Sequence, residues 1–180
     1  MAADDLLLRQ APHSPQAEQA VLGSMLIDPD CIKDVMDKLQ PEDFYLRANR
    51  DIFETIYHMF IYSRPIDGVT VAGEMERNGV YNDNTRDYLV QLMDVTPTSA
   101  NVMEYVKIVL DKSLMRQVAA AAGSITAMVQ EGNGDAGDML ESAEQKVYAI
   151  RRGRSAQNMV TVSMVLQLSL IHISEPTRRS

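Results

Sequence analysis

Two pairs of carboxylates have the spacing that acid–base chemistry would need. Asp34 and Asp37 are three residues apart, and Glu42 and Asp43 are adjacent. In such a pair, one carboxyl group could act as a general acid while the other acts as a general base. Carboxylates also occur on solvated helix faces and at helix caps, and we favour this interpretation over catalysis for both pairs.

Histidine and cysteine, the usual metal ligands and nucleophiles, are few in this chain. The single cysteine is Cys31, and the histidines His13, His58 and His172 pair neither with it nor with one another at metal-ligand spacing. His58 lies beside apolar neighbours in a helical pattern, which favours a packing or surface role over catalysis. The sequence therefore predicts no metal site and no catalytic residue.

The phosphate-binding motifs are equally weak. Gly132-x-Gly134-x-x-Gly137 matches the dinucleotide fingerprint in letters, but no strand precedes it and it falls in a turn between two helices. A Walker A motif, GxxxxGK[ST], is absent from the chain. We therefore predict no cofactor-binding residue.

The charge of the chain argues against direct contact with nucleic acid. The formal net charge is −8, and such a surface repels phosphate backbones. Arg151, Arg152 and Arg154 could touch a phosphate, but three arginines at a helix end are more simply a C-terminal cap.

The longest element is a helix predicted over residues 98–130. Thr98 and Ser99 are favourable N-cap residues, and apolar side chains then recur every three or four residues. A second helix is predicted from Asp135 to about residue 152, after a turn that contains Gly132 and Gly134. Because the connection is short, the two helices must fold back antiparallel as a hairpin.

Shorter helices precede the hairpin, and no stretch shows the alternation of a strand. Ser14 and Pro15 begin the first helix, and Gly23 within it suggests the close approach of another backbone. Asn49 is predicted to cap the third helix and Thr70 the fourth. The fold class is therefore all-α, a compact multi-helix head followed by a long antiparallel helical hairpin.

Tyrosines are the best candidates for interface anchors, because Tyr is favoured at protein–protein interfaces. Core packing is an equally good interpretation for each of them: Tyr57, Tyr62, Tyr81, Tyr88, Tyr105 and Tyr148. The lone cysteine, the acidic N-terminus and the absence of a long apolar run together predict a cytoplasmic protein without a membrane span. The residues alone thus indicate an acidic all-α interaction module, such as a free-standing adaptor.

Several segments together resemble the start of the bacterial DnaB-type replicative DNA helicases. They follow one another in the order and spacing of that family: 12–23 (PHSPQAEQAVLG), 43–45 (DFY), 49–53 (NRDIF), 64–67 (RPID), 69–70 (VT) and 96–102 (TPTSANV). Each match is weak alone, but the series is specific and spans about residues 12–152.

The resemblance implies a domain of a ring hexamer that unwinds DNA 5′ to 3′ with ATP and Mg. In that family, the N-terminal domains pair as a trimer of dimers and form a collar that docks primase and helps to admit single-stranded DNA. The Walker A motif lies on a RecA-like domain, which we expect beyond the end of this chain, so the fragment should be inactive alone. The resemblance places no catalytic residue on any position here.

The resemblance also divides the chain. We expect a flexible arm over 1–13, the head over 14–95, the hairpin over 96–152 and the start of a linker over 153–167. Residues 168–180 depart from the family and resemble a translated sequencing adapter, that is, a non-native tail; a genuine short tail is the alternative. An in-frame Walker A motif downstream of codon 167 would favour the helicase, and a true stop codon the free-standing adaptor.

Overall fold

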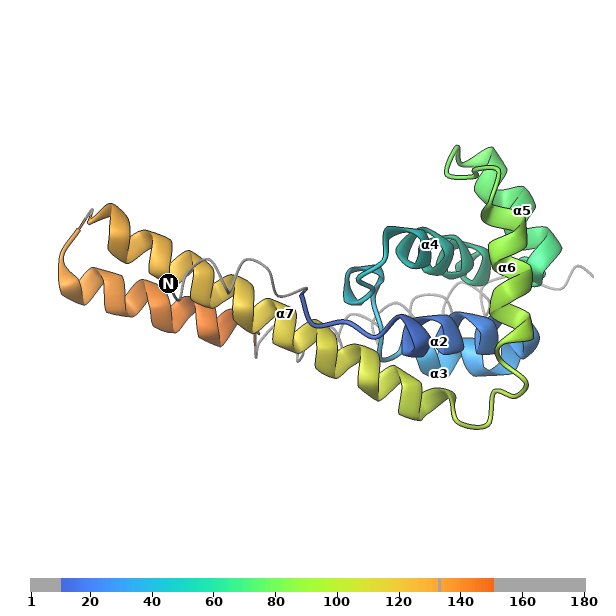
Figure 1. Cartoon of the computed structure of the whole chain (residues 1–180), viewed down its shortest axis with the longest axis horizontal. Helices are drawn as coiled ribbons and strands as arrows, with labels where there is room; N and C mark the ends of the chain where they lie inside the picture. The colour runs from blue at the N-terminus through green and yellow to red at the C-terminus, as the bar shows by residue number, and fades with distance from the viewer. Residues whose placement is uncertain (1–10, 133, 151–180) are drawn as a thin grey trace, which may run out of the picture. The chain divides into compact units, whose positions relative to one another are not determined.

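A computed structural model describes residues 11–132 and 134–150, which are entirely helical apart from turns and loops (Figure 1). The elements, in order, are α2 (Pro15–Ile27), η1 (Pro29–Cys31), α3 (Ile32–Met36), η2 (Pro41–Asp43), α4 (Arg47–Ile61), α5 (Gly68–Arg77), α6 (Thr85–Asp94) and α7 (Val102–Glu131). Residues 136–150 form a further helix, and the described residues contain no strand. The predicted all-α class is confirmed.

The chain divides into two compact units, and the division falls within α7, between Arg116 and Gln117. The core of the first unit contains side chains from α2 to α6 and from the first half of α7. Its largest fully buried apolar side chains are Phe44, Phe53, Leu22, Met25, Ile32, Leu39, Ile52, Ile56, Leu89 and Leu92. Val102, Val106 and Val109 of α7 are also buried there, which ties the start of the long helix to the head.

Helix α2 is the central element of this core. Ser14 is its N-cap, with the hydroxyl accepting from the Ala17 amide at 3.4 Å, and Pro15 occupies the first turn, as predicted. A Cβ atom placed on Gly23 would overlap the side chain of Thr96 and the carbonyl oxygen of Leu92. The predicted close approach of another backbone is therefore confirmed, and that backbone belongs to the end of α6.

Two of the predicted caps are wrong. Asn49 lies inside α4, which begins after Leu46, and its side chain is buried instead of capping a helix end. The N-cap of α5 is Asp67, whose carboxylate accepts from the amides of Val69 and Thr70 at 2.8 and 2.9 Å. Thr70 occupies the third helical position, and its hydroxyl oxygen accepts a hydrogen bond from the Asp67 amide at 2.9 Å, which completes a capping box.

The second unit contains the predicted hairpin. Residues 117–131 of α7 and the helix over 136–150 lie side by side and run in opposite directions (Figure 1). Gly132 and Gly134 have φ values of 64° and 127°, a conformation that favours glycine, so the turn forms where the sequence placed it. Among residues 11–132 and 134–150, no helix has both the length and the hydropathy of a membrane span.

Candidate interaction surface

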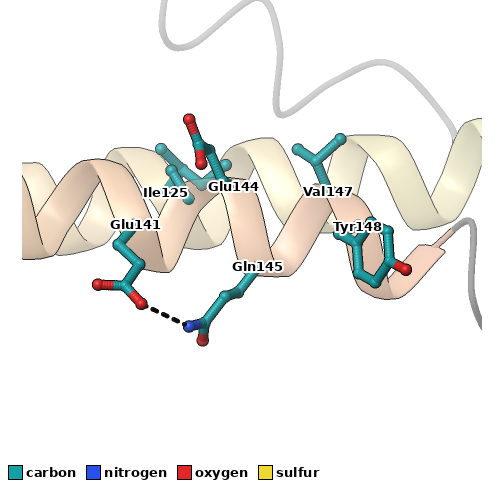
Figure 2. Close-up of a pocket in the computed structure, with 7 residues that line it drawn as sticks. Ile125, Glu141, Glu144, Gln145, Val147 and Tyr148 are labelled. Carbon is teal, nitrogen blue, oxygen red and sulfur yellow. Dashed lines mark hydrogen bonds between the residues drawn. The ribbon is translucent and has the colours of Figure 1, made fainter.

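An open pocket of about 680 Å³ lies between the two helices of the second unit (Figure 2). Ile125 lines it from α7, and Glu141, Ala143, Glu144, Gln145, Val147 and Tyr148 line it from the helix over 136–150. Ala143 and Val147 are four residues apart on that helix and are therefore neighbours on its surface, and Tyr148 follows Val147 directly. Gln145 donates a hydrogen bond to Glu141 at 3.3 Å. The pocket therefore combines apolar side chains with two carboxylates.

Apolar side chains on both helices of the second unit are strongly exposed. Leu140 is 63% exposed, Val147 is 53% and Tyr148 is 61%, and on α7 Val118 and Val129 are 52% and 58% exposed. Exposed apolar side chains on a helical pair are typical of a protein–protein contact. Burial of these side chains by a partner would remove them from water, which favours association.

The tyrosines predicted as interface anchors divide into two groups. Tyr57, Tyr88 and Tyr105 are half-buried and pack against the core of the first unit. Tyr62, Tyr81 and Tyr148 are 70%, 36% and 61% exposed. The core interpretation holds for the first group, and Tyr148 is the tyrosine that lines the pocket.

The two carboxylate pairs differ in their surroundings. Asp34 and Glu42 are exposed. Asp43 is only 7% exposed, so it is not part of a solvated face; it accepts a bond from the Ser113 hydroxyl at 2.7 Å and another from the Gln40 amide at 2.9 Å. Asp43 therefore joins the turn before α4 to α7 and has a structural role.

The candidate metal ligands are also dispersed. No cluster of three or more His, Cys, Asp or Glu side chains suited to a metal ion occurs within the described residues. Burial, followed by the charge of Asp28, raises the pKa of the Cys31 thiol to about 11, so the thiolate nucleophile is scarce near neutral pH. His58 is exposed and lies 3.9 Å from Glu54 on the same helix. His172, Arg151, Arg152 and Arg154 lie outside the described residues.

Sequence reasoning missed a buried polar network in the head. Glu18 of α2 is 1% exposed, and its carboxylate accepts from the amides of Tyr45 and Leu46 and from the side chain of Asn49, at 2.8, 3.3 and 2.8 Å. The Asn49 amide oxygen in turn accepts from the Tyr88 hydroxyl at 2.6 Å. The sequence did contain a signal for the burial of Glu18. This residue precedes Val21 by three positions and Leu22 by four, so it lies on the apolar side of the predicted helix.

Residues 10–111 match the family described as the DnaB-like helicase N terminal domain, which is more than half of the 180-residue chain. The chain belongs to this family. The match includes the head and the first part of α7, the elements that the Glu18 network and Asp43 hold together.

Relatives of this DnaB-like domain are replicative DNA helicases named DnaB. The chain is 34% identical over 165 residues to the protein of Mycobacterium leprae and 32% identical over 149 residues to that of Pasteurella multocida. These alignments cover 88% and 82% of this chain but only 27% and 32% of the relatives. The chain thus spans about a third of the length of the DnaB proteins that it matches.

Solved structures of the same domain share this fold. The N-terminal domain of DnaB helicase from Mycobacterium tuberculosis is 35% identical and superposes with a TM-score of 0.72, covering 78% of this chain and 99% of that domain. The N-terminal domain of the Helicobacter pylori DnaB helicase, studied with its interactions with primase, superposes with a TM-score of 0.57. At 23% identity, that second likeness concerns the fold alone.

Proposed function

We propose that this chain is the N-terminal collar domain of a replicative DNA helicase and that it serves ring assembly and primase docking. The match of residues 10–111 to the DnaB-like family carries this proposal. The apolar surface around Val147 and Tyr148 supports it, because a domain that joins copies and recruits a partner needs side chains that gain from burial.

The partners in this proposal are other copies of the chain, as dimers and as a trimer of dimers, and a primase. The interaction of the Helicobacter pylori domain with primase supports the second partner. Single-stranded DNA would be bound only by the complete ring, in keeping with the net charge of −8 on this chain. A cytoplasmic location accompanies this role.

ATP-dependent 5′ to 3′ unwinding of DNA would belong to the parent helicase. The Walker A motif that binds ATP and Mg is absent from this sequence, so the chain alone is expected to hydrolyse no ATP. We assign functional extents of 14–95 to the head and 96–152 to the hairpin, and the first half of α7, within the second extent, packs against the head.

The experiment is a comparison of Tyr148→Ala with Tyr62→Ala. Both tyrosines are exposed, but Tyr148 lines the hairpin pocket and Tyr62 lies on the head at the end of α4. We expect Tyr148→Ala to weaken self-association, followed by light scattering, or primase binding by about tenfold or more. Tyr62→Ala should leave both unchanged.

A wild-type chain that stays monomeric at high concentration and does not bind primase would contradict the proposal. A free-standing helical adaptor is the alternative, and it would also use the hairpin. The genomic DNA downstream of codon 167 separates the two, because the helicase requires an in-frame GxxxxGK[ST] there.

A further inference from the structure

The pocket of the second unit places carboxylates next to exposed apolar side chains. Glu141, Glu144 and Tyr148 line it at spacings of three and four residues, so they follow one another along one face of the helix over 136–150. Val147, three residues after Glu144, adjoins the same face. Figure 2 shows Glu144 and Val147 pointing to one side of this helix and Glu141 to the other. The apolar side chains of Val147 and Tyr148 therefore have a carboxylate on the preceding turn.

Both carboxylates are accessible to a partner. Glu141 and Glu144 are exposed, and the hydrogen bond that Glu141 accepts at 3.3 Å comes from the neutral side chain of Gln145. The ion pairs between described residues all lie in the first unit, on α4, on α5 and in the loop that joins them. Within residues 11–132 and 134–150, no Lys or Arg thus forms an ion pair with either glutamate.

The whole hairpin is acidic. Residues 117–150 contain five carboxylates and a single cationic side chain, Lys146, which gives a formal net charge of −4. Such a surface repels nucleic-acid phosphates and acidic peptides and attracts cationic segments. The same surface of a second copy carries the same negative charge, and like charges across an interface oppose association. Charge therefore favours a basic occupant over nucleic acid, an acidic peptide or another copy.

The shape of the pocket selects a helix as its occupant. The pocket has a volume of about 680 Å³, and apolar side chains line it from two antiparallel helices. A groove of this kind is filled by the apolar stripe of an amphipathic helix, whose side chains recur every three or four residues. An extended peptide gains its affinity from an exposed sheet edge, and the described part of the hairpin contains no strand.

We propose that the occupant of this pocket is an amphipathic helix that carries lysine or arginine beside its apolar stripe. The apolar stripe packs on Ile125, Val147 and Tyr148, and the cations pair with Glu141 and Glu144. This inference rests on the proposed function, primase docking. It states the chemistry that the primase must present, and it assigns this pocket to the primase and not to a second copy.

Two synthetic peptides test the occupant on the full chain. One is a helix with leucines spaced by three and four residues and lysines beside them, and the matched peptide has glutamate in place of lysine. We expect the lysine peptide to bind in isothermal titration calorimetry and the glutamate peptide to bind about tenfold more weakly or less. A rise in salt from about 0.05 M to about 0.5 M should reduce this difference, because salt screens exposed charges.

Charge substitutions in the chain locate the site. Glu141→Gln and Glu144→Gln keep the size of the side chain, and each should weaken binding of the lysine peptide by about threefold. Glu144→Lys should weaken it further and strengthen binding of the glutamate peptide. Glu76→Gln removes the same charge from an exposed position of α5 in the head, so it is the matched control and should leave both affinities unchanged.

The same variants separate this inference from the proposed function. Primase binding that weakens in Glu141→Gln and Glu144→Gln supports both. Primase binding that neither variant changes would overturn the inference and leave the proposed function standing. A wild-type chain that binds the lysine peptide but not primase would instead overturn the proposed function and support the chemistry of the pocket.

Three further results would each overturn the inference. The first is equal affinity for the two peptides, and the second is an equal loss of affinity in Glu144→Gln and Glu76→Gln. The third concerns a second copy as the occupant. Self-association that Tyr148→Ala weakens and Glu144→Gln strengthens, measured by light scattering, would assign the pocket to another copy of the chain.

Discussion

The side-chain amide of Asn49 donates a hydrogen bond of 2.8 Å to the carboxylate of Glu18, a residue that is only 1% exposed. The same carboxylate accepts from the amides of Tyr45 and Leu46, and Leu46 is the N-cap of α4 but has no side-chain cap bond of its own. Glu18 therefore satisfies backbone donors just before α4 from a different helix. The bond from Tyr88 to Asn49 extends this link from α2 and α4 to α6.

Replacement of Glu18 by glutamine should destabilise the head. The carboxylate accepts from three donors, whereas the glutamine NH₂ group is itself a donor and would leave at least one of them unpaired in a buried site. We expect the free energy of unfolding in urea to fall by about 1–3 kcal/mol. Glu76→Gln, at an exposed position of α5, should change it by less than about 0.5 kcal/mol. Equal effects of the two substitutions would contradict the role given to Glu18.

Two glycines in the middle of helices should respond oppositely to alanine. At Gly23 a Cβ atom would overlap Thr96 and the backbone of Leu92, so α2 and α6 must separate; at Gly73 it would meet no atom within 4 Å. We expect Gly23→Ala to cost about 1–3 kcal/mol through overpacking. Gly73→Ala should instead stabilise α5 by about 0.5–1 kcal/mol, through helix propensity alone. Thermal unfolding of both variants provides the measurement, and a stabilising Gly23→Ala would show that the helices can separate freely.

The helices and the apolar core could be predicted from periodicity, because the spacing of residues such as Ile52, Phe53 and Ile56 reflects burial on one side of a helix. The hairpin turn was also predictable, since Gly132 and Gly134 adopt positive φ values. The caps at Asn49 and Thr70 were not. Asn is a favourable N-cap residue, so the sequence alone suggested a helix end at Asn49. Asn49 is instead buried within α4, where its side chain bonds Glu18 of another helix.

The interaction surface was predictable only in outline. The sequence indicated an interaction module, and Tyr148 was one of six candidate tyrosines. Which tyrosines are exposed depends on tertiary packing, as Tyr88 shows by its bond to Asn49. The guanidinium of Arg116 donates hydrogen bonds to the backbone carbonyl oxygens of Pro12 and Asp43. These bonds were not predictable, because both residues are distant from Arg116 in sequence and the acceptors belong to the backbone.

The N-cap of α5 should make stability depend on pH in the acid range. The backbone amides of Thr70 and Val69 lower the pKa of the Asp67 carboxyl group from its ordinary value of 3.8. A depressed carboxyl pKa adds stability above the unfolded-state pKa, and this stability is lost as the pH falls through the folded-state pKa. Asp67→Ala should therefore cost about 1 kcal/mol at neutral pH and progressively less below about pH 4. Urea unfolding from pH 7 to pH 2 measures the difference, with Asp111→Ala, an exposed position of α7, as the control expected to show no such loss.

Cys31 should react slowly with alkylating reagents in the folded protein. Burial and the nearby carboxylates of Asp28, Asp34 and Asp30 raise its thiol pKa from 9.0 to about 11, and only the thiolate attacks. At pH 8, two units of pKa reduce the thiolate fraction about a hundredfold relative to the unfolded chain. Iodoacetamide labelling followed by mass spectrometry should show this slowing, and the rate in the folded protein should still be rising at pH 10, where the unfolded chain has levelled off. Asp34→Asn removes one of the raising charges and should speed the folded-state reaction, whereas Asp138→Asn in the second unit should not. A rate that has levelled off by pH 10 in the folded wild type would show that the thiol is solvated like a free cysteine.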